Sequence, residues 1–282
     1  MFGQRFVETS PVENLETPVG TYFAEFPDFE AQTMPPVSER FECVYEPIYK
    51  RFGHRFIPAG HKASVRLKQN TNEFGREAVA GDTTLTMFRA MEQGATQREV
   101  LSCQLESFAS QFQEHDRMAM EIDIFDLETD QTGLTALTRL IEDAKQLGIP
   151  ADRFILELSA SPLIDVGVLY AISEKLKATG ARVALINVDI DAFSMSRIFQ
   201  IEPFAVKFNR SWRSVARLDK RLVDMTRSLV EQIQSDGKFC CFTGVETEAD
   251  LEFVKTCKFT RCQGSFFGEP STTMTRGAVY TV

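Results

Sequence analysis

Short apolar runs alternate with amphipathic segments through the second half of the chain. Three such runs are residues 154–158, 182–187 and 204–208, and helix-like segments lie between them. Strands that are apolar throughout are typical of a parallel sheet covered on both faces, with helices as the crossovers. This stretch therefore predicts repeated strand–helix–strand units around a buried parallel sheet.

The pattern extends towards both ends of the chain. Near the start, two alternating runs are joined by a short turn, which predicts an antiparallel hairpin because a short loop cannot connect parallel strands. The expected strands are residues 40–49, 55–67, 118–125, 154–158, 182–187, 204–208, 238–244 and 261–267. The expected helices are residues 84–92, 99–112, 132–147, 163–179, 193–199, 218–235 and 246–254.

Eight expected strands, beginning with a hairpin and continuing as strand–helix units, favour a closed α/β barrel. The expected fold is a TIM-like (β/α)8 barrel with an antiparallel first strand, and an open doubly wound sheet is the alternative. In such a barrel the functional residues lie at the C-terminal ends of the strands and in the loops that follow.

The domain organisation follows from length and from the irregular start of the chain. A chain of 282 residues is long enough for one barrel of about 250 residues. Residues 1–38 contain several prolines and acids without a sustained period, so we predict an extended or disordered leader there and a barrel domain over 39–282. Phe23, Phe26 and Phe29 could instead dock the leader on the domain or on a partner.

Charge and cysteine usage narrow the functional classes. The net charge of -9 disfavours binding to nucleic acid or to an anionic membrane surface, because both partners are negatively charged. The six cysteines form no C-x-x-C pair and no zinc spacing, which favours buried free thiols in a reducing compartment. The chain has neither the apolar core of a signal peptide nor a run long enough to span a bilayer, so we predict a cytoplasmic protein.

Two charged residues lie inside strands that are otherwise apolar. Glu157 interrupts the run 154–158 and Lys207 interrupts the run 204–208. An unpaired charge buried on both faces of a sheet costs several kcal/mol or forces neutralisation. Glu157 and Lys207 are therefore expected either to face a site or to pair with each other.

Several segments together resemble the EAL domain, the family of cyclic di-GMP phosphodiesterases. They are residues 62–66 (KASVR), 148–161 (GIPADRFILELSAS), 180–187 (GARVALIN), 206–212 (VKFNRSW), 242–247 (FTGVET) and 262–270 (CQGSFFGEP). The combination of G-V-E-T, Q-G and an upstream V-K-x-N is specific, and the resemblance covers about residues 39–282. It implies a TIM-like barrel and a bacterial protein of cyclic di-GMP signalling.

Active EAL domains use carboxylates and one Asn to hold two divalent cations, Mg²⁺ or Mn²⁺, which bind the water nucleophile and the scissile phosphate. In this chain the first position of the family's Glu-Ala-Leu motif is Lys62, so a metal ligand has become a cation. Asp123 matches the family's Asn after a small gap, and Glu157 stands in the place of the second Glu ligand. We therefore expect no metal cofactor and no phosphodiesterase activity in this chain.

The remaining family positions have changed in part. Asn187 stands in the second position of the family's Asp-Asp pair, and Thr243 replaces the first Glu of the family's Ala-Glu-Gly-Val-Glu. Lys207 matches the site lysine, whereas Glu246 and Gln263 match family residues without change. If the alignment slipped locally, Asp189 or Asp191 could replace the missing carboxylates, but both are also typical of a solvated turn.

The resemblance and the residues together define the candidate roles. We expect Glu157 to form a buried ion pair with Lys207, and with Lys62 as a further partner, in place of the metals; contact with a nucleotide is the alternative.

Arg66 matches the family arginine that approaches a phosphate, and Gln263 is expected at the rim of the same pocket, with a solvent-facing strand end as the alternative for both. Asp123 and Glu246 complete the candidate ligand-binding set, and Glu246 is also expected to cap or orient a loop. The histidines His54, His61 and His115 lack the spacing of a metal site.

Two functional hypotheses follow. The first is a degenerate, non-catalytic EAL protein that regulates by binding a protein partner, or alternatively cyclic di-GMP. The second is a residual metal-dependent cyclic di-GMP phosphodiesterase, which would hold its metal at Glu157 and Asp123. A homodimer of the family type is possible in either case.

Overall fold

The computed structural model describes residues 39, 41–68, 97–112, 119–123, 131–160, 164–188, 192–216, 219–274 and 277–281. The chain divides into two units, Met1–Met34 and Pro35–Val282, and every described residue belongs to the second unit. The predicted leader, the helix expected at 84–92, His115, Asp189 and Asp191 lie outside the described residues, as does the side chain of Asp123.

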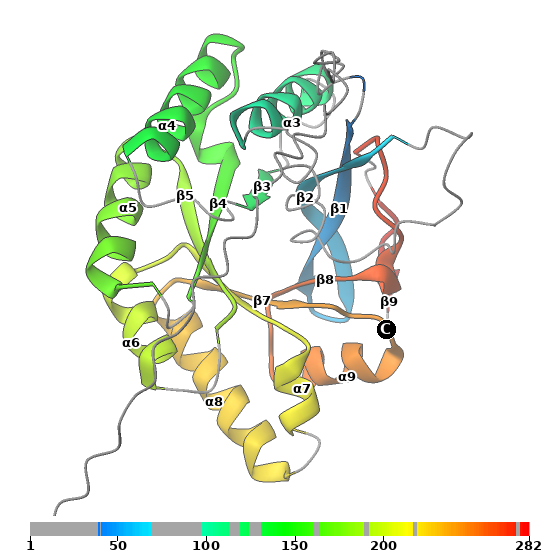
Figure 1. Ribbon diagram of the computed structural model, residues 1–282. Helices are drawn as coiled ribbons and strands as arrows, with labels where there is room; N and C mark the ends of the chain where they lie inside the picture. Colours follow the sequence, from blue (N-terminus) through cyan, green and yellow to red (C-terminus); the bar gives the residue numbers. More distant parts are fainter. Residues whose placement is uncertain are drawn as a thin grey trace, which may run out of the picture. The chain divides into compact units, whose positions relative to one another are not determined.

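Eight strands form a closed ring, as the sequence pattern predicted (Figure 1). The ring strands are β1 (Phe41–Phe52), β2 (Arg55–Leu67), β3 (Ala119–Asp123), β4 (Phe154–Ser159), β5 (Arg182–Ile186), β6 (Ala205–Phe208), β7 (Phe239–Thr243) and β8 (Arg261–Gln263). A ninth strand, β9 (Tyr280–Thr281), lies outside the ring. Their order is β1-β8-β7-β6-β5-β4-β3-β2-β9, and β1 also pairs with β2. Because β1 is hydrogen-bonded to both β2 and β8, the ring closes and an open doubly wound sheet is excluded.

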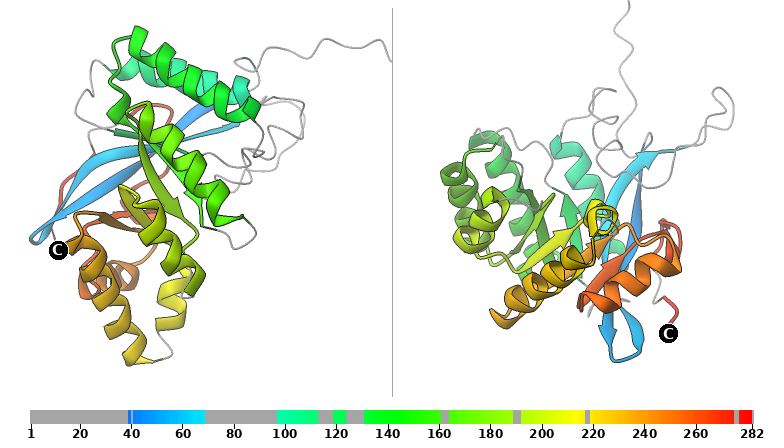
Figure 2. Two further views of the ribbon diagram at one scale, coloured as in Figure 1. Left: turned by 90° about the vertical axis from the view of Figure 1, so that its left-hand side faces the viewer. Right: turned by 90° about the horizontal axis from the view of Figure 1, so that it is seen from below.

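Only β1 and the short β9 run against the other strands. β1 is antiparallel to β2 and to β8, whereas the strands from β2 to β8 are parallel to one another. β9 adds to the outer edge of β2 in antiparallel register and was not predicted from the sequence. The β1–β2 hairpin is the longest pair and projects beyond the neighbouring strands (Figure 2). The predicted TIM-like barrel with an antiparallel first strand is therefore confirmed.

Helices lie around the outside of the strands (Figures 1 and 2). They are α3 (Gln97–Phe112), α4 (Gln131–Gln146), α5 (Val166–Ala178), α6 (Ala192–Ile201), α7 (Ser211–Ala216), α8 (Lys220–Ser235) and α9 (Glu248–Thr256), with 3-10 turns η1 (Ala151–Arg153) and η2 (Ser265–Phe267). Within the described residues, no helix combines the length and the apolar character that crossing a membrane requires.

Several predicted elements differ from the structure at their boundaries, and for two of them a local contact gives the reason. The helix expected at 218–235 begins at Lys220, because the Asp219 carboxylate caps it by accepting from the Arg221 backbone N–H, and α7 precedes it as a separate helix. The strand expected at 261–267 ends at Gln263. Gly264 has a φ of 151°, and a Cβ there would lie 2.2 Å from the carbonyl oxygen of Val245, so only glycine fits this approach.

Side chains on the strands alternate between two environments. On β4, Leu156 and Leu158 belong to the large apolar core that packs against the helices. Ile155 points the other way and forms a small apolar cluster with Ala184 and Ala205 inside the barrel. Two residues farther along β4 this interior face carries Glu157. The alternation therefore places a carboxylate inside the barrel, towards the C-terminal ends of the strands.

Candidate functional site

Glu157 lies at the centre of a buried polar cluster inside the barrel. Its side chain is fully buried, and its Oε2 accepts from the Lys62 Nζ at 2.7 Å. Its Oε1 forms an ion pair with the Nζ of Lys207, whose side chain is 3% exposed. β2, β4 and β6 thus each contribute one charged side chain. The predicted ion pair of Glu157 with Lys207 is confirmed, and Lys62 is its second cation.

The cluster continues from Lys207 to the first and last strands of the barrel. The Lys207 Nζ donates to the Gln263 Oε1 at 2.8 Å, and the Gln263 Nε2 donates to the Glu46 Oε2 at 2.8 Å. Glu46 on β1 lies directly opposite Lys62 on β2 in the hairpin register. The alternative of a solvent-facing strand end is wrong for Gln263, because its side chain is buried and its amide bridges an ammonium and a carboxylate.

Burial controls the protonation of this cluster. Desolvation is the largest effect on Lys207 and lowers its pKa to about 7, and the nearby positive charge of Lys62 acts in the same direction. Burial raises the pKa of Glu46, against the opposing influence of Lys62 and Lys207. The barrel interior therefore holds a set of charges whose protonation states depend on one another.

The cluster does not fit a pair of divalent cations. Mg²⁺ or Mn²⁺ requires about six hard oxygen ligands, and two adjacent ions require several carboxylates. Both carboxylate oxygens of Glu157 instead face ammonium groups. Among the residues that the structure describes, no group of three or more His, Cys, Asp or Glu side chains is arranged to hold a metal ion. An ammonium on each oxygen of Glu157 would repel a divalent cation approaching that carboxylate.

Arg66 and Asp123, the other candidate ligands near β2, lie in different surroundings. The Arg66 Nε donates to the Glu42 Oε1 at 2.6 Å, and its side chain is 45% exposed. Asp123 is the register neighbour of Glu157 across β3 and β4. Arg66 thus sits at the exposed end of the β1–β2 pair and has a carboxylate partner, whereas only the backbone of Asp123 is placed beside the cluster.

Asn187 and Thr243 lie at the ends of their strands. Asn187 follows β5, is exposed, has a φ of 55° and donates from Nδ2 to the Ser159 Oγ at 3.3 Å. Asparagine tolerates this left-handed backbone better than most residues. The Thr243 hydroxyl donates to the carbonyl oxygen of Phe208 at 3.3 Å. Both side chains thus contact residues of neighbouring strands.

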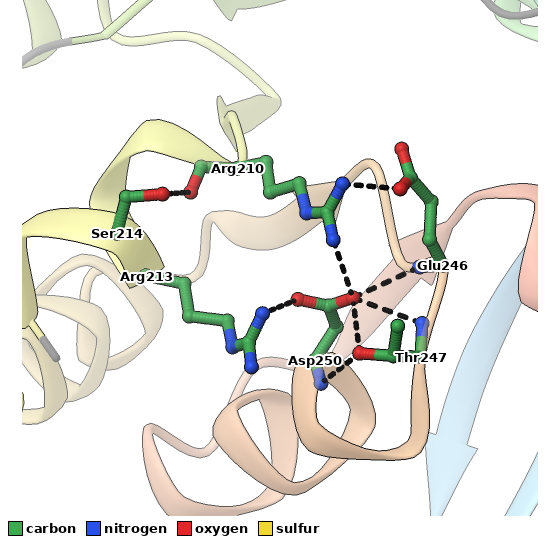
Figure 3. A network of polar contacts seen from close by, with 6 residues as sticks. All are labelled: Arg210, Arg213, Ser214, Glu246, Thr247 and Asp250. Atoms are coloured by element: carbon green, nitrogen blue, oxygen red, sulfur yellow. Dashed lines mark hydrogen bonds and ion pairs between the residues drawn. The ribbon is translucent and has the colours of Figure 1, made fainter.

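A second polar network joins the loops that follow β6 and β7 (Figure 3). Asp250 on α9 is fully buried and accepts from the backbone N–H groups of Glu246 at 3.1 Å and Thr247 at 2.9 Å. Arg210, in the loop after β6, and Arg213, on α7, also contact the carboxylate of Asp250. The network therefore ties the β6–α7 loop to the start of α9.

Glu246 belongs to the edge of this second network. Its carboxylate pairs with Arg210, and both side chains are at least 40% exposed. Glu246 was expected to cap or orient a loop, and its pair with Arg210 joins the loop after β7 to the loop after β6. The cap of α9 is Thr247, which forms a capping box with Asp250.

Asp250 is expected to stabilise this end of the barrel. Burial alone would raise its pKa, but hydrogen bonds from Thr247 and from two backbone N–H groups outweigh burial and lower the pKa. Asp250→Asn removes the charge at constant size and should lower the free energy of unfolding by about 2 kcal/mol, a typical value for hydrogen bonds to a charged group. Urea unfolding measures the change. Asp224→Asn, an exposed partner of Arg227, is the matched control and should cost less than about 1 kcal/mol.

Sequence reasoning did not single out Glu46, Arg210 or Asp250. Glu46 carried a weaker signal than Glu157, because the expected strand 40–49 alternates and also contains Arg40 and Glu42. Asp250 follows Thr247 at the spacing of a capping box, but its arginine partners are distant in sequence. Their contribution became visible only in the folded chain.

Comparison with known proteins places the fold. Among solved structures, an EAL domain protein from Listeria monocytogenes EGD-e is 20% identical, with a TM-score of 0.64 over 82% of this chain and 89% of that chain. The FimX EAL domain from Xanthomonas citri, solved in complex with c-diGMP, is 14% identical, with a TM-score of 0.67 over 86% of this chain and 92% of that chain. The YkuI protein from Bacillus subtilis, solved with substrate c-di-GMP and calcium, is 15% identical, with a TM-score of 0.64 over 85% of this chain and 58% of that chain.

These identities show a shared fold, and the family match is independent of them. No curated protein sequence matches the chain. The family model described as the EAL domain matches residues 32–270, which is most of the chain and includes every residue of the Glu157 cluster. The chain belongs to the EAL domain family, which is related to cyclic di-GMP phosphodiesterases.

Proposed function

We propose that this chain is a non-catalytic EAL domain that regulates by binding, with a protein as its partner. The observation that carries the proposal is the occupation of both Glu157 oxygens by the ammonium groups of Lys62 and Lys207. A divalent cation approaching this carboxylate meets an ammonium group at each oxygen and would have to displace one of them. Breaking a buried pair leaves an uncompensated charge, which is strongly unfavourable.

The chemistry that two divalent cations supply in the family's reaction also supports a non-catalytic role for this chain. In the family's reaction, the two cations would generate the water nucleophile and neutralise the phosphate charge. Lys62 and Lys207 bring positive charge to the interior but cannot lower the pKa of a bound water as a metal does. The chain would therefore retain the barrel without the group that makes the nucleophile.

A protein partner is favoured over cyclic di-GMP by the state of the candidate ligand residues. The amide of Gln263 is already used by Lys207 and Glu46, and the guanidinium of Arg66 already contacts Glu42. The FimX domain from Xanthomonas citri was solved with bound c-diGMP, so this fold accepts the dinucleotide in that relative. In this chain the Arg66–Glu42 ion pair is exposed and weak. If the chain bound the dinucleotide, Arg66 is therefore the residue that a phosphate would most easily draw away from its present partner.

The absence of catalysis is tested by incubating the purified full chain with cyclic di-GMP and Mg²⁺ or Mn²⁺. The expected result is unchanged dinucleotide, measured by chromatography of the reaction mixture. Linear product that forms with the metals and disappears with EDTA would overturn the proposal in favour of a residual phosphodiesterase. In that case Asp123→Asn should reduce turnover, because that enzyme would hold its metal at Glu157 and Asp123.

The class of partner is tested by calorimetric titration of cyclic di-GMP, with Mg²⁺ and with EDTA. We expect no binding heat at about 100 μM ligand, where micromolar affinity registers. Metal-independent heat that is lost in Arg66→Ala but kept in Arg221→Ala would instead identify a nucleotide receptor. Arg221 is a suitable control because its side chain is 90% exposed and its partner is Asp219, the N-cap of the same helix.

A further inference from the structure

Two arginines and two phenylalanines meet at the end of the barrel opposite the C-terminal strand ends. Arg182, Phe239 and Arg261 are the first residues of β5, β7 and β8, and Phe204 directly precedes β6. The Arg182 guanidinium lies 4.5 Å from the centre of the Phe204 ring. The Arg261 guanidinium lies 4.3 Å from the Phe239 ring centre and 5.6 Å from that of Phe204. Both cations thus share one aromatic platform.

The two arginines differ in their polar partners. The Arg182 Nη2 donates to the Asp152 Oδ2 at 3.0 Å. The Arg261 side chain forms no hydrogen bond or ion pair with any residue of the described ranges, and its Nε is buried without an acceptor. Stacking satisfies the faces of a guanidinium, but its N–H donors lie in the plane and need acceptors at the edge. The Nε–H of Arg261 therefore lacks an oxygen acceptor.

The surroundings of Arg261 add positive charge. Lys50 on β1 is the register neighbour of Arg261 across the β1–β8 pair, which places both residues on the same face of the sheet, and Lys50 is exposed. The next residue, Arg51, lies on the other face of β1 and donates to the carbonyl oxygen of Lys255 at 3.0 Å, so it does not take part. Burial lowers the pKa of Arg261, and the nearby charge of Arg182 acts in the same direction. Lys50, Arg182 and Arg261 thus place three cations at this end of the barrel, and Asp152 is the carboxylate that pairs with Arg182.

We propose that Arg261 is the centre of an oxyanion-binding site at the N-terminal end of the barrel. The ligand is a carboxylate or phosphate group, because planar paired N–H donors match two oxygens of such a group. Arg261 supplies the donors, Phe239 and Phe204 hold the guanidinium plane, and Arg182 and Lys50 add attraction. The proposal does not depend on the proposed function, although the charge of Arg261 acts on Lys207 of the Glu157 cluster.

The wild-type chain provides the primary test. The ¹H–¹⁵N signal of the Arg261 Nε is followed during titration with sodium phosphate and, separately, sodium citrate, each against sodium chloride at equal ionic strength. We expect a saturable shift with phosphate or citrate that chloride does not reproduce. A preference for phosphate or for citrate identifies which oxyanion the site takes. A shift no larger than that caused by chloride would overturn the proposal, whatever the variants do.

Two variants locate the binding at the guanidinium. Arg261→Gln is expected to weaken the interaction at least tenfold, and Arg261→Lys to weaken it less, because lysine keeps the charge and loses the paired donors. Arg221→Gln, at an exposed position in the first turn of α8, should leave the interaction unchanged. Binding is measured in the variants by calorimetry with the same salts, after circular dichroism has shown that they are folded. Unchanged affinity in a folded Arg261→Gln would overturn the assignment.

Discussion

Replacing Glu157 by glutamine is expected to lower the free energy of unfolding by about 3–5 kcal/mol, the usual cost of removing one partner of a buried ion pair. The carboxylate is fully buried and is shared by Lys62 and Lys207, so its loss leaves two ammonium groups facing a neutral amide. Lys207 can release its proton near pH 7, which relieves part of this penalty. The destabilisation should therefore be larger at pH 6 than at pH 8.

Urea unfolding at the two pH values measures this effect. Glu174→Gln is the matched control: it removes the same group from an exposed pair with Lys177 and should cost less than about 1 kcal/mol. The double variant Glu157→Met with Lys207→Met should recover much of the lost stability, because apolar replacement of a buried pair removes both desolvation penalties. A Glu157→Gln variant as stable as the Glu174→Gln control would contradict the buried pair.

Stability is expected to rise from about pH 7 towards pH 8.5 and to fall steeply above about pH 9. The rise comes from Lys207, whose pKa is about 7 in the folded chain and near 10.5 when unfolded. Between these values the unfolded chain binds the additional proton, so raising the pH favours the folded state by up to about 1.4 kcal/mol per pH unit.

The fall comes from thiols buried in the core. Cys43, Cys240, Cys241, Cys257 and Cys262 are all buried. Burial raises the pKa of Cys43 and Cys257 to about 12 and that of Cys241 to about 11, from an ordinary value of 9.0, and the other two shift in the same direction. Above pH 9 these thiols ionise only in the unfolded chain. The folded chain then binds more protons, and stability falls as the pH rises.

Urea unfolding under reducing conditions from pH 6.5 to pH 10 separates the two contributions. Lys207→Met should abolish the rise below pH 8.5 and retain the fall above pH 9, because it leaves the thiols in place. Lys175→Met, at an exposed position on α5, should preserve both. A rise that persists unchanged in Lys207→Met would show that another group controls stability near neutral pH.

The sequence predicted most of the ring of strands because its signals are local. The β1–β2 hairpin and the apolar runs of β4, β5 and β6 each follow from alternation or from continuous burial. Boundaries were less accurate where a single contact ends an element. Gly264 ends β8 because its backbone passes against Val245, and no pattern around residue 264 reports that approach.

The candidate site was predicted in part for the same reason. A charge within an apolar strand is visible in the sequence, and burial of that charge requires a partner, so Glu157 and Lys207 could be paired in advance. Gln263 could not be placed, since glutamine is equally compatible with a solvent-facing strand end. Its position depends on the stagger of β8 against β1, which brings its amide between Lys207 and Glu46.

By itself, the sequence determined the alternation of strands and helices, the family resemblance and the presence of charges that need partners. Only the tertiary structure decided which partners they have. Glu157 on β4 joins Lys62 on β2 to Lys207 on β6, and Gln263 on β8 joins Lys207 to Glu46 on β1; the register of these strands is set by closure of the whole ring. Arg182 and Arg261 likewise stack on Phe204 and Phe239 because neighbouring strands begin at one end of the barrel, and no local sequence pattern specifies that arrangement.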